Sequence, residues 1–390
     1  MKHLYTLVLL FIISGTTVKG QQPLTDKILI EFMKPGDKDA EAKGYNILPW
    51  PEEAKAAAYK AADIWASYLE ITVPIRVKFG WCNNIEANAE GSPKYNYQYT
   101  DGYYYPLALI NQLLGYDRNE NVVDITCVFK SSHSWYFGLE EDQQWEPDTI
   151  NIGAMCSKNS IIPTMLHEIC HGLGITSSMV IEDGRGTYGS IYGNIPNIYD
   201  SFLCDKQGNT LIDKNIYKNN SIDIANILTS DELYWIGKNA TEANNDQKVK
   251  IHAPNPWKKG NSICHIATEY GRTINDLMSS GKGGVTSMNG MNNKYTFSPG
   301  PIVLGMLQDI GWTVKDTPTA NEFTEQKLSD IRVYTIGDHI KIEGTDQFSM
   351  ISVIDMSGRV RYSGSAKNDI RLSSGIYIVK IGEQSFKVKI

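Results

Sequence analysis

"MLHEICHGLGITSS", residues 165–178, contains two histidines four positions apart with a glutamate directly after the first. His167 and His171 stand one helical turn apart, so both rings leave the same helix face and can bind one zinc ion at about 2.0–2.1 Å. Glu168 projects to the side of this pair, where it can take a proton from an activated water without binding the metal. The stretch predicts a helix that supplies two zinc ligands and a general base.

The flanking residues predict where this helix begins and ends, and which elements precede it. Pro163 lies near the start of residues 160–174, and Gly172 and Gly174 lie near the end, as helix boundaries favour. After Pro51, residues 52–70 combine strong helix formers with apolar residues at helical spacing. Strands are predicted, from β-branched residues, at 71–81, 121–129 and 148–155.

The region after the motif predicts loops and short elements. Residues 179–260 are loop-rich, with a hairpin turn at 204–212 and a short helix at 230–240. A Gly/Ser/Asn loop covers 279–293, and residues 298–312 predict a closing helix that ends near Gly311.

The character of the sequence changes after Trp312. Residues 316–330 are polar and lack periodicity, which predicts a linker. Residues 331–390 alternate apolar and polar side chains between Gly-centred turns and predict a small β-sandwich. The expected fold class is therefore α+β: a domain at 21–315 with an insertion at about 179–260, followed by an all-β module at 331–390.

Composition and the N-terminus exclude several classes of protein. The chain has 390 residues and a net charge of −7, and without a basic stripe we expect no nucleic-acid partner. Residues 1–20 predict a cleaved export signal, and no other segment predicts a membrane span. The six cysteines allow fifteen full disulfide pairings, and the sequence does not choose among them.

A catalytic zinc ion requires a third protein ligand and one open position. Once His3 in the signal and His339 in the terminal module are set aside, three histidines remain outside the motif. The open alternatives for the third ligand are His133, His252, His265 and a carboxylate such as Glu269, as in thermolysin-type enzymes.

Three segments together resemble the leishmanolysin-type metzincin peptidases: "HEICHGLG" (167–174), "GNSICHIATEYGRTINDLMSS" (260–280) and "SPGPIVLGMLQDIGW" (298–312). Metzincins with a contiguous long motif have their third histidine where this chain has Ser177, whereas the leishmanolysin type places an inserted subdomain before it. The resemblance spans roughly residues 50–315 and is nearest to bacterial secreted members. It implies zinc ligands His167, His171 and His265, the base Glu168, the turning glycine Gly174 and the methionine-turn residue Met278.

The resemblance has further implications for the site. A long insertion before the third ligand is tolerable because the entropy of loop closure rises only logarithmically with length. Residues 124–138 resemble the edge strand of metzincins, which could pair with an extended peptide substrate. Position 280, two residues after Met278, is Ser280 and not the tyrosine that astacin-like relatives have there.

The terminal module resembles the sorting domain of the type IX secretion system of Bacteroidetes bacteria. The matching pieces are "VIDMSGRVRYSG" (353–364), "LSSGIYIVKI" (372–381) and the final "KVKI" (387–390). The resemblance implies export across the outer membrane through that machinery. The alternative is an ordinary β-sandwich binding module.

These patterns together predict a secreted or cell-surface zinc metalloendopeptidase. We expect it to act as a monomer on extended polypeptides, with Zn²⁺ as its cofactor and Glu168 as the general base. The intact glutamate argues against an inactive relic. The competing interpretation is a non-catalytic adhesin that retains a structural zinc on a peptidase scaffold.

Overall fold

The computed structural model describes residues 26–120, 122–139, 159–267, 277–280, 297–315, 332–336, 339–343, 350–355, 359–365, 370–381 and 384–390. The expected signal sequence, the predicted strand at 148–155, most of the Gly/Ser/Asn loop and the linker lie outside these residues. The chain divides into two compact units, residues 1–315 and 316–390. Helices and several separate sheets make the fold α+β, as predicted.

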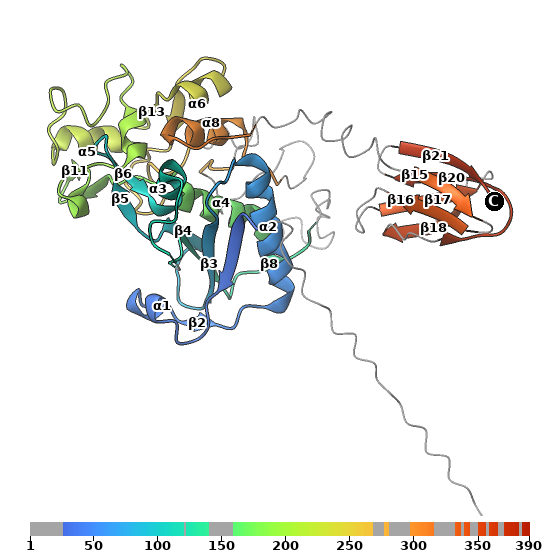
Figure 1. Cartoon of the computed structure of the whole chain (residues 1–390). Helices are drawn as coiled ribbons and strands as arrows, with labels where there is room; N and C mark the ends of the chain where they lie inside the picture. The colour runs from blue at the N-terminus through green and yellow to red at the C-terminus, as the bar shows by residue number, and fades with distance from the viewer. Residues whose placement is uncertain are drawn as a thin grey trace, which may run out of the picture. The chain divides into compact units, whose positions relative to one another are not determined.

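A five-stranded mixed sheet lies at the centre of the first unit (Figure 1). Its strands are β1 (Ile28–Phe32), β2 (Ile47–Leu48), β3 (Ile75–Cys82), β4 (Ala89–Pro93) and β7 (Ile125–Lys130). Strands β1, β3 and β7 are parallel, whereas β4 runs antiparallel to β7 and β2 antiparallel to β3. The predicted strands at 71–81 and 121–129 are thus confirmed as β3 and β7.

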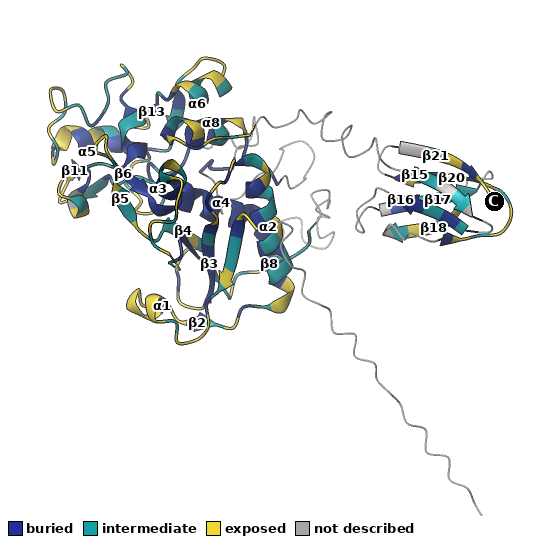
Figure 2. Ribbon diagram, in the orientation of Figure 1, coloured by how far each residue is buried: buried dark blue, intermediate teal, exposed yellow. Residues whose placement is uncertain are grey.

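Two helices pack on this sheet and on each other. Helix α2 (Lys55–Tyr68) contacts β1, and α4 (Ile161–Leu173) contacts β7 and β4. The indole N–H of Trp65 in α2 donates to the backbone carbonyl of Leu166 in α4 at 3.1 Å. Every residue of α4 is buried (Figure 2). Both helices follow the predicted ranges, and the motif helix is therefore a core element with little freedom to move.

Two glycines let α4 approach its neighbours and end where it does. A Cβ atom at Gly172 would lie 2.2 Å from the side chain of Ile125, so only glycine allows the helix this close to β7. Gly174 follows the last helical residue with φ +127°, a conformation that residues with a side chain rarely adopt.

The prediction that residues 124–138 form an edge strand is wrong. β7 lies between β3 and β4, and nearly all of its side chains are buried, as expected for an interior strand covered on both faces. The edge is β4, with the sequence "AEGSP". Glycine and proline give this segment no strand signal, although Pro93 is tolerated because edge strands can spare a backbone donor.

The inserted region is richer in structure than its sequence predicts. The hairpin turn at 204–212 is confirmed, since Cys204 and Thr210 form an antiparallel bridge. The helix at 230–240 is only partly right: Leu233 and Trp235 alternate with an intermediate Tyr234 in a strand, and the helix begins at Lys238. The insertion contains β10 (Val180–Glu182), β11 (Arg185–Thr187), η2 (Ser190–Tyr192), η3 (Ile198–Phe202), β12 (Leu203–Cys204), α5 (Ile222–Leu228), β13 (Leu233–Trp235), α6 (Lys238–Ala243) and β14 (Val249–Ile251).

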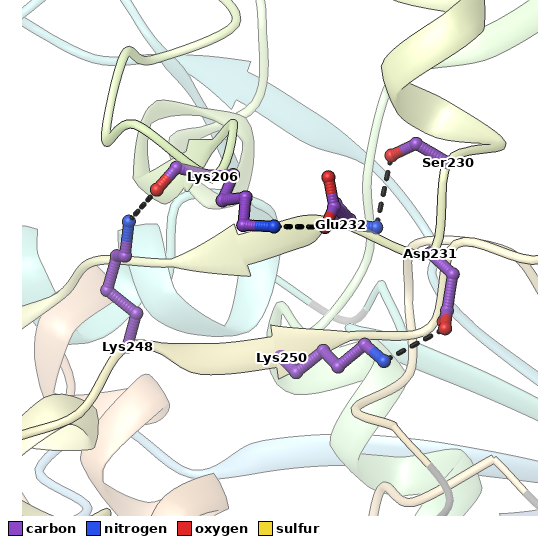
Figure 3. Close-up of polar contacts among 6 residues, drawn as sticks. All are labelled: Lys206, Ser230, Asp231, Glu232, Lys248 and Lys250. Atoms are coloured by element: carbon purple, nitrogen blue, oxygen red, sulfur yellow. Dashed lines mark hydrogen bonds and ion pairs between the residues drawn. The ribbon is translucent and has the colours of Figure 1, made fainter.

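Ion pairs and hydrogen bonds reinforce the small sheet β12–β13–β14 (Figure 3). Lys206 pairs with Glu232 at 2.6 Å, and Lys250 on β14 pairs with Asp231 at 2.9 Å. The ammonium group of Lys248 donates to the backbone carbonyl of Lys206 at 2.5 Å. Exposed pairs of this kind contribute little each. Ile251 at the end of β14 forms a β-bridge with Ile266, the residue after the third candidate histidine.

The closing helix α8 (Pro301–Ile310) ends at Gly311, as predicted. Asp309 near its end accepts hydrogen bonds from the indole of Trp235 and from the backbone N–H groups of Asn239 and Ala240. These donors belong to β13 and the first turn of α6, so one carboxylate joins the closing helix to the insertion. The first unit also contains α1 (Lys38–Ala42), η1 (Glu52–Ala54), β5 (Asn96–Gln98), β6 (Tyr104–Pro106), α3 (Leu107–Leu114), β8 (Trp135–Tyr136) and β9 (Asn159–Ser160).

The second unit consists of strands in the residues described. One sheet has the order β15–β16–β19 and the other the order β18–β17–β20–β21, with antiparallel pairing throughout. Side chains of both sheets, including Ile340, Val353 and Val379, share one buried cluster. The strands are β15 (Arg332–Ile336), β16 (His339–Glu343), β17 (Met350–Asp355), β18 (Val360–Ser365), β19 (Ile370–Arg371), β20 (Ile376–Ile381) and β21 (Gln384–Lys389).

None of the helices in the described part of the chain has the length and apolar character that a membrane crossing requires. The five cysteines in the described residues, which are Cys82, Cys127, Cys170, Cys204 and Cys264, are all free thiols. Cys156 lies outside the described residues.

Candidate metal centre

Helix α4 presents the two histidines of the motif toward one point. The rings of His167 and His171 have centroids 4.9 Å apart, as expected for side chains one turn apart on the same face. The two residues are 3% and 8% exposed, so both imidazoles are shielded from bulk water.

His265 reaches the same point from the end of the insertion. The following residue, Ile266, forms β-bridges to Ile251 on one side and to Ser279 on the other. The backbone N–H of His252 donates to the carbonyl of His265 at 2.8 Å. These backbone contacts hold the chain at His265 in place beside the other two histidines. The His265 side chain belongs to a residue that is 7% exposed.

The three rings form a compact cluster. The centroid of the His265 ring lies 5.0 Å from those of His167 and His171, and the nearest ring nitrogens of the three lie within 4.8 Å of one another. The Nε2 atoms of His167 and His265 are 3.0 Å apart. Two nitrogens bound tetrahedrally to one zinc ion at about 2.0–2.1 Å would be roughly 3.3 Å apart, so the spacing fits a shared cation.

A backbone carbonyl orients each ring. The Nδ1 atoms of His167, His171 and His265 lie 3.1, 2.7 and 2.8 Å from the carbonyl oxygens of Leu277, Ile175 and Asn261. A carbonyl only accepts, so each Nδ1 carries the proton and each Nε2 keeps its lone pair. Histidines that bind metal ions in proteins are typically oriented in this way, by a hydrogen bond from the ring nitrogen that does not bind the metal.

Burial keeps the three imidazoles neutral. It lowers the pKa of His167 to about 3, with a further contribution from His171. Burial also lowers the pKa values of His171 and His265. Neutral imidazole is the form that binds zinc. No fourth ligand joins the cluster among the described residues, and the donor set of three histidines fits a zinc ion with one open position.

Glu168 follows His167 in α4 and is buried. Its side chain is 6% exposed, and burial, followed by the charge of Glu90, raises its pKa to about 8. The backbone N–H of Gly91 on β4 donates to its carboxyl group and opposes the shift. A bound divalent cation would oppose it further, because a nearby positive charge favours the carboxylate.

The other predicted site residues have structural positions that the fold explains. Gly174 ends α4, and Met278 is completely buried. The backbone around Met278 contributes more than its side chain: the Met278 carbonyl accepts from Ile266 at 2.9 Å, and the preceding carbonyl orients His167.

The alternative third ligands are not in the cluster. The ring of His133 packs on Trp135, with centroids 4.4 Å apart. His252 lies near His265 through its backbone, but its ring is outside the group of converging nitrogens. Glu269 lies outside the described residues. Sequence reasoning missed the carbonyls of Leu277, Ile175 and Asn261, because a backbone group has no residue type that would signal it.

No protein-family model matches this sequence, and neither a curated protein nor a solved structure gives a significant match to it. The function is therefore inferred from the chemistry of the site.

Proposed function

We propose that the protein is a secreted zinc-dependent endopeptidase. The observation on which this rests is the convergence of three neutral imidazoles, each oriented by a backbone carbonyl, next to a buried glutamate. A zinc ion held by His167, His171 and His265 would lower the pKa of a bound water to about 7 and polarise a substrate carbonyl.

The remaining steps of the proposed reaction are assigned to Glu168 and to helix α4. Glu168 accepts the proton of the attacking water and returns it to the leaving amine, as a general base and then a general acid. Its burial, and the Gly91 N–H, hold the carboxylate in one position. Residues of α4 exclude bulk water because the helix is buried along its whole length.

Strand β4 gives this site a means of holding an extended polypeptide. It is the outermost strand beside α4, and Gly91 in its middle contacts Glu168. In the described part of the chain no further strand pairs with it. An extended peptide can add to such an edge through main-chain hydrogen bonds, which would place a peptide bond next to the glutamate.

We also propose the finer assignments of fold and destination. The mixed sheet, the motif helix, the third histidine after an insertion and the buried Met278 support a leishmanolysin-like metzincin domain. The two antiparallel sheets around one core support a β-sandwich in the second unit. The sequence resemblance of that unit supports a sorting domain for type IX secretion, with the signal at residues 1–20 starting export.

The adhesin alternative is less well supported. A purely structural zinc site is closed by a fourth protein ligand, and the described residues offer three. Incubation of the purified protein with denatured casein distinguishes the endopeptidase from the adhesin. We expect cleavage that a chelator abolishes and added zinc restores. One bound zinc per chain without cleavage of casein or of a mixed peptide library would support the adhesin instead.

A further inference from the structure

Ser177 and Ser178, which follow the motif helix, are bound by a buried carboxylate from the insertion. Both serine hydroxyls donate to Asp200, and the backbone N–H of Ser178 donates at 3.1 Å. The backbone N–H of Asn197 adds another hydrogen bond at 3.0 Å. Asp200 is 0% exposed, so these donors replace its water shell. Ser177 stands where a contiguous metzincin motif has its third histidine, and here it is an anchor point.

This anchor fixes the segment that orients the second histidine. The carbonyl of Ile175, two residues before Ser177, accepts from His171 at 2.7 Å. The backbone N–H of Met179 donates to the Ser177 hydroxyl at 2.9 Å. Asp200 thus holds residues 177–178 in place. Without this contact the chain could rotate at Gly174, because glycine restricts the backbone least.

The neighbouring residue Tyr199 holds the other half of the cluster. It is completely buried, and its hydroxyl donates to the carbonyl of Ile263 at 2.7 Å. Ile263 has φ +64°, an unfavourable conformation for a β-branched residue that persists only where its surroundings impose it. Two residues later the chain presents His265.

We propose that Tyr199 and Asp200, adjacent on the single turn η3, are positioning residues that hold the two halves of the histidine cluster at metal-binding distance. The inference rests on the proposed metal centre. Asp200 acts on the His171 side through Ser177 and Ser178, and Tyr199 acts on the His265 side through Ile263. The insertion that separates the ligands in sequence therefore supplies the connection that joins them in space.

The mechanism is preorganisation. Metal ligands held in place before binding lose less conformational entropy when the ion arrives. Outer groups that orient ligands typically change metal affinity by about 10–100-fold when removed. Tyr199 and Asp200 act through the backbone one step further out, so we expect the lower end of this range.

The test uses the full mature chain and two matched pairs of variants. Tyr199→Phe removes the hydroxyl that donates to Ile263, and Asp200→Asn replaces the charge and one of the two acceptor oxygens with an amide donor, each with little change in volume. Tyr217→Phe and Asp205→Asn are the controls, because the Tyr217 hydroxyl donates to Asp205 at 2.5 Å in the same insertion but away from the histidines. Zinc affinity is measured by competition with a chromogenic chelator, and the visible absorption of the Co²⁺-loaded protein reports ligand geometry.

We expect each test variant to bind zinc about 10-fold more weakly and to show an altered Co²⁺ spectrum, while both controls match the wild type. Equal affinities and identical spectra in all proteins would overturn the proposal. So would a loss of apo-protein thermal stability with unchanged affinity in the folded fraction, since that is a merely structural role. Ser177→Ala, which removes one hydroxyl, serves if Asp200→Asn does not fold. If the wild type itself takes up neither Zn²⁺ nor Co²⁺, the metal centre fails and this proposal with it.

Discussion

The Nε2 atoms of His167 and His265 lie 3.0 Å apart although 98 positions separate the two residues in the chain. Both rings use Nδ1–H to donate to backbone carbonyls, so two lone pairs face each other across this gap. Without a cation or a proton between them, such an arrangement is electrostatically unfavourable. The geometry of the pair therefore suits the proposed metal centre, in which a cation would lie between the two lone pairs.

Removing His265 should therefore abolish metal binding. We expect His265→Ala to weaken zinc affinity by more than about 100-fold and to remove peptidase activity, because two ligands on one helix do not hold the ion. Zinc content after dialysis and casein cleavage are the measurements. His133→Ala is the matched control and should retain both properties. Full zinc occupancy in His265→Ala would move the third ligand elsewhere.

Glu168 should affect the rate without affecting the metal. Glu168→Gln keeps the size of the side chain but removes its capacity to accept a proton, so we expect turnover to fall by about 10²–10⁴-fold with one zinc still bound. The exposed Glu53, replaced in the same way, controls for a general effect of charge. A rate close to that of the wild type would exclude Glu168 as the base.

Gly91 should be intolerant of any side chain. A Cβ atom there would lie 2.2 Å from the backbone carbonyl oxygen of Glu168, so β4 or α4 would have to move. We expect Gly91→Ala to lower the free energy of unfolding by about 1–3 kcal/mol, as overpacking does, and to reduce activity. Ser92→Ala on the same strand should do neither. Denaturant titration and casein cleavage check this, and an unaffected Gly91→Ala protein would contradict the close contact.

Asp124 should make stability depend on pH. Burial raises its pKa to about 6, although it accepts hydrogen bonds from the backbone of Arg76 and the side chain of Asn111. The folded state therefore binds the proton more tightly than the unfolded state, whose pKa is about 3.9. The stabilising contribution is complete below about pH 4 and is lost as the pH rises through about 6, an effect on the order of 2–3 kcal/mol.

The comparison that isolates this effect is Asp124→Asn, which lacks the titrating group. We expect the stability of the wild type relative to the variant to fall between pH 4 and pH 7 in denaturant titrations. Stability curves that stay parallel over this range would show that Asp124 does not titrate as described.

Much of the fold follows from local sequence. The helices at 52–70 and 160–174, the closing helix, and the strands β3 and β7 have strong periodicity and clear boundary residues. β4 was missed because "AEGSP" has no strand propensity and pairs only because β7 offers it a partner. The short helix predicted at 230–240 is correct only from Lys238 onward, because Leu233–Trp235 pair with β14 and form a strand.

For the site, local sequence is enough to predict the pair His167 and His171, the adjacent Glu168 and the glycine that ends their helix, because residues one turn apart share a face wherever the helix lies. Residue types alone leave His133, His252, His265 and a carboxylate such as Glu269 open as the third ligand. The family resemblance favours His265, and the tertiary structure brings its ring to the other two. The carbonyls that orient the rings, and the contacts of Tyr199 and Asp200, were likewise decided by folding. Backbone groups are the same in every residue, so their role depends on where the chain places them and not on which side chain they bear.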